Sequence, residues 1–429
     1  MVKPLEISIL DDYSTNCLIM TSKVNQDVKQ LIIRVLQNKT FSSLNKARKD
    51  FILSVLWHIL SIKGKINFTQ LGRFSPYCEQ SHRIHFEQEF DFLPFNKLLC
   101  EQIIDKDRIL AFDPSYIPKS GKLTYGRGRF WSGSAKATKW GLDICGFAVV
   151  DVENNTAFHL KAWQTPGIDN PDAEQFNLLS HYASIISENA KTFKEISDYI
   201  VADAYFSKKI IVDTVLDAKL HFISRLRDDS VLMYKHYGGP TGKRGRPRKV
   251  EGRINVNEPD TNYFDKHICN EDLTIYSAVV HSKAFNRDTN LAIAVFFKEG
   301  KEIARKLYFS TDLKQEGSQI VRYYRSRFQI EFLYRDAKQH TGLNDCQARS
   351  KNKLDFHFNA SLTTVNLAKY DWLSNESTER TPFSMANYKS FFNNTLMLEQ
   401  FICRFGINAN SAKNQKIVKE LLEWGRIAA

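Results

Sequence analysis

Two short apolar runs that each end on an aspartate place the strongest limit on the fold. One covers residues 108–113 and ends on Asp113, and the other covers residues 199–203 and ends on Asp203. Each run has the length and the apolar content of a buried strand. Buried strands need other elements packed on both faces of their sheet, so an α/β architecture is expected.

Further strands and helices alternate around these two runs. The expected order is three strands, a helix, a strand, a helix and a strand, with the additional strands at 142–152, 157–163 and 220–224 and the helices at 172–191 and 208–218. This order matches the ribonuclease-H-like pattern, which is a mixed five-stranded sheet with helices on its faces. Residues 226–309 break the alternation with β-like stretches, which we interpret as a mostly β insertion domain.

The chain therefore divides into five expected regions. They are a helical DNA-binding region at 1–105, the first part of the catalytic core at 106–225, the β-rich insertion at 226–309, the second part of the core at 310–345, and a helical C-terminal region at 346–429. Within the first region, residues 67–85 have the pattern of a helix, a turn and a second helix that could enter a major groove. A plain helical bundle is the alternative interpretation of the same pattern.

Four polar residues share one face of a helix expected after the insertion. They are Tyr324, Arg327, Glu331 and Lys338. At about 100° per residue, their positions fall within an arc of about 60° and span roughly 21 Å of rise. One face thus carries a carboxylate between two cations and a phenol. Such a face can hold a metal ion and grip a DNA strand beside it.

Asp113, Asp203 and Glu331 together form the candidate catalytic set. Side chains at the carboxyl ends of strands in an α/β sheet are placed to build a site. Three carboxylates can hold two Mg²⁺ ions about 3.5–4 Å apart for an in-line phosphoryl displacement. The alternatives are ordinary: an aspartate after a strand is often a turn former or a helix cap, and Glu331 and Arg327 could be a simple i,i+4 ion pair.

The spacing of the four polar residues adds a family resemblance. Tyr324-x2-Arg327-x3-Glu331-x6-Lys338 resembles the Y-R-E-K signature of bacterial insertion-sequence transposases of the DDE type, which are cut-and-paste enzymes with an inserted β domain. Residues 201–206 and 109–113 resemble the second and first aspartate motifs of that group. The resemblance implies that Asp113, Asp203 and Glu331 bind Mg²⁺, with Mn²⁺ as a substitute, and that Tyr324, Arg327 and Lys338 hold DNA phosphates.

The same resemblance implies a reaction and its partners. The expected reaction is cleavage of double-stranded DNA at terminal inverted repeats and strand transfer into target DNA by a homodimer. In relatives that form a hairpin intermediate, a tryptophan of the insertion domain stacks on a flipped base. This chain has no tryptophan between Trp163 and Trp372, which leaves Tyr276, Phe285 and Tyr308 as substitutes. The alternatives to a transposase are a nuclease without strand transfer and an inactive, transposase-derived DNA-binding protein.

Charge and two basic segments also favour a DNA partner. The net charge is +12, with a pI near 9.2. Arg244, Arg246 and Arg248 lie in a Gly/Pro-rich run that resembles an AT-hook, although a solvated basic loop that touches only phosphates is the alternative. Residues 119–131 mix cations with aromatic side chains beside the proposed site and could lead a strand toward it. Trp140 and Trp163 are expected in the core.

The remaining features exclude other classes of protein. The seven cysteines form no CxxC pair, which is typical of reduced thiols in a cytosolic protein. The start of the chain lacks the apolar region of a signal peptide, and residues 51–60 are too short to span a bilayer. The expected location is therefore the bacterial cytoplasm, at the nucleoid when bound to DNA.

Overall fold

The computed structural model describes residues 23–104, 107–167, 177–238, 249–374, 382–409 and 411–427. Five of its strands form the predicted core, in the spatial order β4-β3-β1-β5-β6. Their bounds are β1 Arg108–Pro118, β3 Ala137–Asp151, β4 Thr156–Thr165, β5 Tyr199–Val201 and β6 His221–Arg225. β3 is antiparallel to β1 and β4, whereas β5 is parallel to β1 and β6. This mixed sheet is consistent with a ribonuclease-H-like transposase fold.

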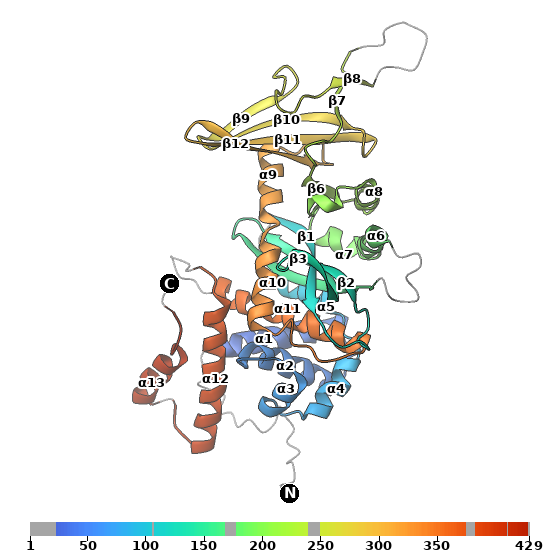
Figure 1. Ribbon diagram of the computed structural model, residues 1–429. Helices are drawn as coiled ribbons and strands as arrows, with labels where there is room; N and C mark the ends of the chain where they lie inside the picture. The colour runs from blue at the N-terminus through green and yellow to red at the C-terminus, as the bar shows by residue number, and fades with distance from the viewer. Residues whose placement is uncertain are drawn as a thin grey trace.

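Strand alternation gives the core sheet two different faces. Phe112 stacks on Phe147 with ring centroids 5.0 Å apart and contacts Tyr182 of α6. The neighbouring Asp113 points to the opposite face, because successive side chains of a strand alternate. Figure 1 shows α6, α7 and α8 on the first face and α10 on the second. Their bounds are α6 Leu178–Glu188, α7 Ala190–Ile196, α8 Lys209–Asp217 and α10 Gln329–His340.

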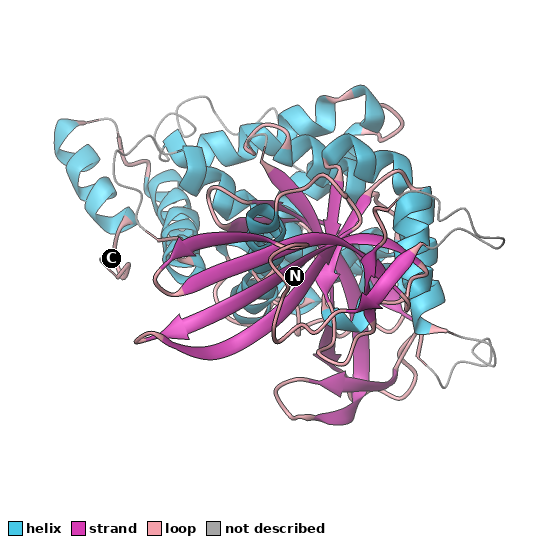
Figure 2. Ribbon diagram, turned by 90° about the horizontal axis from the view of Figure 1, so that it is seen from above, coloured by secondary structure: helices cyan, strands magenta, loops and turns pink. Residues whose placement is uncertain are grey.

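The strands of residues 226–309 continue the core sheet. They are β7 Leu232–Lys235, β8 Val250–Arg253, β9 Asp265–Asn270, β10 Leu273–Ser282, β11 Arg287–Lys298 and β12 Lys301–Ser310. β12 pairs with β6, with Tyr308 opposite Arg225, so that the described residues form one twelve-stranded sheet. The remaining strand, β2, covers Gly128–Ser132. The sheet runs β2-β3-β1-β5-β6-β12-β11-β10-β7-β8, and Figure 2 shows its strands crossing the molecule with helices around them. The β-like stretches of the sequence are therefore strands.

The helix expected to carry all four polar residues is instead two helices. α9 (Gly317–Ser326) ends before Arg327, and α10 begins at Gln329. The amide of Arg327 donates to Tyr324 and that of Glu331 to Phe328, so the hydrogen bonds here span three residues instead of four. Arg327 keeps right-handed helical backbone angles, and α9 and α10 therefore follow one another in nearly one direction (Figure 1).

The helices before and after the core pack together beneath the sheet (Figure 1). The N-terminal group is α1 Lys23–Gln37, the 3₁₀ helix η1 Lys39–Phe41, α2 Lys46–Ser61, α3 Phe68–Phe74, α4 Glu79–Glu87 and α5 Phe92–Cys100. The C-terminal group is α11 Lys351–Ser374, α12 Met385–Phe405 and α13 Ala412–Leu422. On α11, Asn359 and Asn366 accept hydrogen bonds of 2.8 Å from the backbone amides of Ala162 and His159 on β4. These side chains accept hydrogen bonds from backbone amides of the edge strand that no neighbouring strand pairs with, and they fix α11 to the sheet.

The helix, turn and helix expected at residues 67–85 are present as α3 and α4. α4 buries His82 and Phe86, whereas Arg83 on its outer face forms an ion pair with Glu79. The described geometry therefore has the expected helix-turn-helix outline, and its contact with DNA stays a prediction. Across the described ranges, no helix has both the length and the apolarity that a membrane span requires.

Candidate catalytic carboxylate site

Asp113 lies within β1 and not at its end, which corrects the sequence-based expectation. β1 continues to Pro118 because β3 is long enough to pair with it throughout, with Asp113 opposite Gly146. On its other side, β1 pairs with β5 only at Leu110 and Ala111. The edge of β1 beside Asp113 is therefore open toward the segment that follows β5. That segment carries Asp203.

Asp203 follows β5 and begins the 3₁₀ helix η3 (Ala204–Phe206). Its Oδ1 accepts a hydrogen bond of 2.6 Å from the amide of Ala204, so the helix-cap role is real. The same oxygen lies 3.4 Å from the hydroxyl of Tyr324, which donates to it from α9. Capping of η3 holds the Asp203 carboxylate beside the polar helix face, so a helix-cap role and a role in the candidate site are compatible.

One guanidinium joins the other two carboxylates. Arg327 Nη1 lies 3.2 Å from Asp113 Oδ1, and Arg327 Nη2 lies 3.1 Å from Glu331 Oε1. The Arg327 side chain is only 11% exposed. Glu331 and Arg327 are thus an i,i+4 pair, as the ordinary interpretation expected, but the pair also reaches across to the strand that carries Asp113.

Burial and neighbouring charges both act on Asp113 and Arg327. Burial raises the pKa of Asp113 to about 7, Arg327 opposes this increase, and the negative charges of Glu331 and Asp203 add to it. For Arg327, burial acts to lower the pKa, but Asp113 leads the neighbouring groups that raise it above its ordinary value. Asp113 and Arg327 are therefore a buried ion pair, and the two neighbouring carboxylates act on both of its members.

The donor set fits a divalent cation by its chemistry. All three candidate ligands offer carboxylate oxygens, which Mg²⁺ prefers, and the raised pKa of Asp113 indicates a site that gains from an added positive charge. In the described part of the chain, no three His, Cys, Asp or Glu side chains are close enough to form a metal cluster. The guanidinium of Arg327 lies between Asp113 and Glu331 and takes up part of that space.

The other polar residues of the predicted face lie on the same side of the sheet. Lys338 Nζ donates a hydrogen bond of 2.8 Å to Ser115 Oγ, two residues along β1 from Asp113. Burial lowers the pKa of Lys338, although Asp143 and Asp113 act against this. The Tyr324 ring packs against Tyr308, and burial raises the pKa of Tyr324 to about 12. Arg244, Arg246 and Arg248 lie outside the described residues.

Tyr334 is a site residue that the sequence interpretation missed. Its hydroxyl donates to the carbonyl oxygen of Asp113 at 2.6 Å and accepts from the amide of Gly146 at 2.8 Å. A Cβ atom at Gly146 would lie 2.3 Å from that hydroxyl, so only glycine leaves room for it. Tyr334 comes three residues after Glu331, on the same helix, and this spacing was the available signal.

Several aromatic expectations need correction. Trp140 is 45% exposed and not in the core, because β3 extends past the end of β1. Trp163 is partly buried and packs edge-on against Phe147, which agrees with a core role. Among the substitutes for a base-stacking tryptophan, Phe285 and Tyr308 are buried and cannot receive a base as they stand. Tyr276 is partly buried, with Lys266 over its ring.

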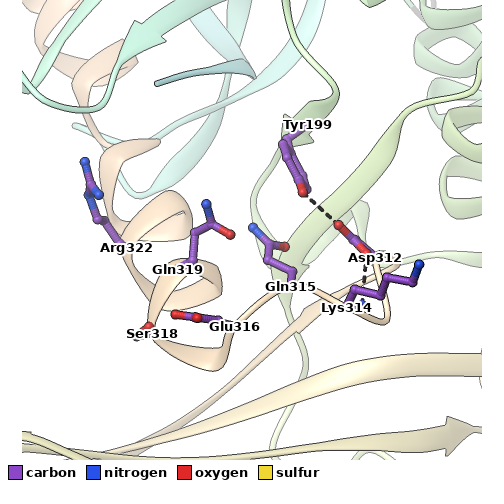
Figure 3. Close-up of a pocket in the computed structure, with 8 residues that line it drawn as sticks. All are labelled: Tyr199, Asp312, Lys314, Gln315, Glu316, Ser318, Gln319 and Arg322. Atoms are coloured by element: carbon purple, nitrogen blue, oxygen red, sulfur yellow. Dashed lines mark hydrogen bonds between the residues drawn. The ribbon is translucent and has the colours of Figure 1, made fainter. Parts of the chain in front are cut away.

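A polar pocket lies away from the carboxylates. It has a volume of about 490 Å³ and polar walls from Tyr199, Asp312, Lys314, Gln315, Glu316, Ser318, Gln319 and Arg322 (Figure 3). Tyr199 donates to Asp312 across it at 2.7 Å. Tyr199 begins β5, whereas Asp203 follows the end of that strand. The carboxylates are instead at the open side of the sheet, which suits a large substrate better than a small molecule.

The geometry agrees with a comparison against protein families. Residues 181–367 match the family model of the transposase DDE domain. The match includes Asp203 and Glu331 and supports a DDE transposase, with activity in DNA transposition and recombination. Asp113 lies before the matched residues, and its place in the site rests on its ion pair with Arg327. No curated protein matches the chain significantly.

Proposed function

We propose that this chain is a transposase of the Y-R-E-K insertion-sequence group, which cuts DNA at element ends and joins the ends to target DNA. The observation that carries this proposal is the bridge from Asp113 through Arg327 to Glu331, with Asp203 hydrogen-bonded to Tyr324 of the same helical segment. Asp113 and Glu331, far apart in the sequence, thereby share one guanidinium, and Asp203 contacts the same helical segment. The domain division into a core, an insertion and two helical regions belongs to the same proposal.

The carboxylates would hold Mg²⁺, or Mn²⁺ in its place. Bound metal supplies activation of water or a 3′-hydroxyl and stabilisation of the leaving oxygen. The chain's own contribution is placement. Tyr334 fixes the backbone of Asp113, the amide of Ala204 orients the Asp203 carboxylate, and α10 presents Glu331 to both. Water and a 3′-hydroxyl are interchangeable nucleophiles in this arrangement, so that one site serves cleavage and joining.

The cations of the site would hold the scissile strand. Lys338 reaches β1 at Ser115, and Arg327 forms ion pairs with both Asp113 and Glu331. If Asp113 and Glu331 held a cation, the guanidinium of Arg327 would be free to donate hydrogen bonds to a DNA phosphate instead. Tyr324, Arg327 and Lys338 then act as the phosphate clamp that the resemblance implies. The arginines 244, 246 and 248 would contact DNA elsewhere along the terminal repeat.

A homodimer would pair the two element ends. The end of α12 and the segment through α13 expose apolar side chains, namely Met397, Phe401, Phe405, Ile407, Ile417, Leu421, Trp424 and Ile427. Phe401 and Phe405 stack on each other one turn apart on α12. An exposed apolar group of this extent favours contact with another protein surface, and a second copy of the chain is the partner that end pairing needs.

Substitution of single carboxylates tests the proposal. Asp203→Asn and Glu331→Gln should each abolish metal-dependent cutting of end DNA while leaving DNA binding intact. Asp217→Asn, at an exposed position of α8, is the matched control and should cut normally. Cutting at the wild-type rate by Asp203→Asn would overturn the assignment.

Pre-cut ends separate the alternatives. A wild-type protein that cuts but never joins pre-cut ends to a plasmid target, with either metal, would be a nuclease. Tight end binding without any cutting would identify an inactive DNA-binding protein derived from a transposase. Joined products are the expected result.

A further inference from the structure

A two-stranded ribbon extends from the core sheet beyond the catalytic carboxylates. It consists of β2 (Gly128–Ser132) and the first residues of β3, and it lies at the opposite end of the sheet from β8. β1 pairs with β3 only as far as Pro118 opposite Gly141, so that the ribbon projects past it. Its register places Arg129 opposite Trp140 and Trp131 opposite Thr138.

One face of this ribbon alternates aromatic rings with guanidinium groups. Residues directly opposite in an antiparallel pair share a face, as do residues two apart on one strand. Arg129, Trp131 and Trp140 therefore lie on the same face. The guanidinium of Arg127 lies 4.5 Å from the Trp140 ring centroid, which completes an alternating set of two cations and two indoles. Trp131 is 64% exposed, and Trp140 is 45% exposed.

The charge around the ribbon indicates the kind of partner. Residues 114–142 contain six cations, namely Lys119, Lys122, Arg127, Arg129, Lys136 and Lys139, and no aspartate or glutamate. Exposed indoles without cations would suit a protein partner, whereas indoles interleaved with cations suit a polyanion that also offers flat rings. Unpaired DNA has both properties, but in duplex DNA the faces of the bases are covered by their neighbours.

The ribbon is held in place before any ligand arrives. The Tyr116 hydroxyl donates to the carbonyl of Trp140 at 2.7 Å. The Tyr116 ring lies so close to Gly141 that a Cβ there would meet it at 2.5 Å. At the other end of the segment, the amide of Tyr125 donates to the carbonyl of Arg349 at 2.8 Å. Because these contacts order both sides of the ribbon, stacking a base on it costs little conformational entropy.

The distance to the carboxylates fixes where on the DNA the ribbon acts. Gly146, opposite Asp113, and Trp140 are six residues apart on β3, which corresponds to about 20 Å of strand. An even separation also places Trp140 on the face of the sheet that carries Asp113 and α10. At about 3.4 Å per stacked nucleotide, this distance from Asp113 corresponds to roughly six nucleotides.

We infer that the Arg127–Arg129–Trp131–Trp140 face is a single-stranded DNA site, which stacks unpaired bases of a strand about six nucleotides from the cut. This inference rests on the proposed function, because it assumes that DNA ends reach the carboxylates. Opening of the duplex near the cut would then be stabilised by the enzyme itself. The two guanidinium groups would hold the phosphates, and the two indoles would stack on the bases.

Binding measured without metal tests the site. The probes are a fluorescein-labelled oligothymidylate and a DNA hairpin that carries thymidine tails of about three, six and nine nucleotides, with anisotropy as the readout. For the wild type, affinity should increase once the tail reaches about six nucleotides. Trp131→Ala and Trp140→Ala should each weaken binding of the oligothymidylate about 5- to 100-fold and remove the gain from the tail. Binding of the blunt hairpin should change less than about twofold.

Matched variants exclude charge and folding effects. Arg129→Ala removes a cation from the aromatic face, whereas Lys139→Ala removes one from the opposite face of the same ribbon. Only the first should lose the preference for tailed DNA, and Trp131→Phe, which keeps a ring, should retain most of it. Equal losses on blunt and tailed DNA would overturn the inference in favour of a duplex contact. Unchanged DNA binding with a lost dimer in sedimentation would overturn it in favour of a protein interface.

The result is separable from the proposed function. These binding measurements need no cutting. If the wild type cuts ends and the tryptophan variants bind tails normally, the single-stranded site is disproved while the proposed function stands. Conversely, Asp203→Asn should bind tails as the wild type does, even where it cannot cut.

Discussion

The Tyr334 hydroxyl donates a hydrogen bond of 2.6 Å to the carbonyl oxygen of Asp113. The bond ties the helix that carries Glu331 to the strand that carries the first acid, while Gly146 donates to the same hydroxyl from β3. The relative position of Asp113 and Glu331 is therefore set by a neutral contact in addition to the charged bridge through Arg327. This neutral contact does not depend on the charge of the Asp113 carboxylate, because it is made to the backbone of that residue.

Removal of this hydroxyl should separate placement from binding. In Tyr334→Phe, the buried amide of Gly146 loses its partner, which should lower the free energy of unfolding by about 1–3 kcal/mol. Cutting of end DNA should fall about 10- to 100-fold, because the Tyr334 hydroxyl no longer holds the backbone of Asp113, a proposed metal ligand. DNA affinity, measured by gel shift without metal, should stay the same. Tyr323→Phe is the control, because its hydroxyl donates to Asp107 away from the site; it should lose stability but cut normally.

Arg327 and a divalent cation should compete for the same carboxylates. In Arg327→Met, Asp113 and Glu331 lose their shared cation, so that the metal-free protein should be destabilised by about 1–3 kcal/mol. Added Mg²⁺ or Mn²⁺ should then raise Tm more in the variant than in the wild type, since the metal no longer has to displace the guanidinium. Scanning fluorimetry across a metal titration measures both effects.

The control for this competition is another arginine on α9, five residues before Arg327. Arg322→Met breaks an ion pair with Asp107 and should show the wild-type response to metal. Identical metal-induced shifts in Arg327→Met and the wild type would contradict the competition. Salt dependence adds a second readout: if Arg327 moves to a phosphate in the DNA complex, its loss should reduce the slope of log affinity against log salt by about one.

Much of the core was predictable because local patterns determine it. The strands around Asp113 and Asp203 and the helices between them follow from apolar periodicity, and the outline of α3 and α4 follows from turn residues. The approach of Tyr324, Arg327, Glu331 and Lys338 to one side of the sheet also follows from periodicity. Those four residues kept their common direction although the chain changes to three-residue hydrogen bonds at Arg327.

The features that were not predicted depend on partners distant in sequence. Asp113 lies within a strand because β3 supplies partners up to Pro118, and no property of residues 108–113 reveals the length of β3. The pairing of β12 with β6 joins two segments more than 80 residues apart and makes the insertion part of the same sheet. Tyr334 was missed because a tyrosine on a helix is ordinarily a packing residue, and only the facing Gly146 gives it another role.

The apolar group on α12 and α13 should control association. Phe405 is 72% exposed, so that Phe405→Asp adds a charge without disturbing the fold of the monomer. If a second copy covers this surface, the variant should sediment as a smaller species on end DNA and should form fewer paired-end complexes, because burying a carboxylate in an apolar contact is costly. Ile210→Asp, at an exposed position of α8, is the control and should assemble normally. An unchanged sedimentation coefficient for Phe405→Asp would place the dimer contact elsewhere.

Lys389 should make stability depend on pH in the alkaline range. Burial lowers the pKa of this lysine on α12 from 10.5 to about 7, although Asp345 partly opposes the decrease. The unfolded chain therefore keeps a proton that the folded protein releases between pH 7 and 10.5, and stability gains from this group as the pH rises through that window. The gain is at most about 1.4 kcal/mol per pH unit.

The variant Lys389→Met lacks this pH-dependent contribution. Its free energy of unfolding should therefore exceed that of the wild type by the largest amount at or below pH 7, and the difference should shrink steadily toward pH 10. Urea denaturation at a series of pH values measures the difference, and Lys416→Met, at an exposed position of α13, should follow the wild type throughout. A constant difference between Lys389→Met and the wild type over this range would show that the ammonium group is retained in the folded protein, held by its hydrogen bond to the carbonyl of Ile59.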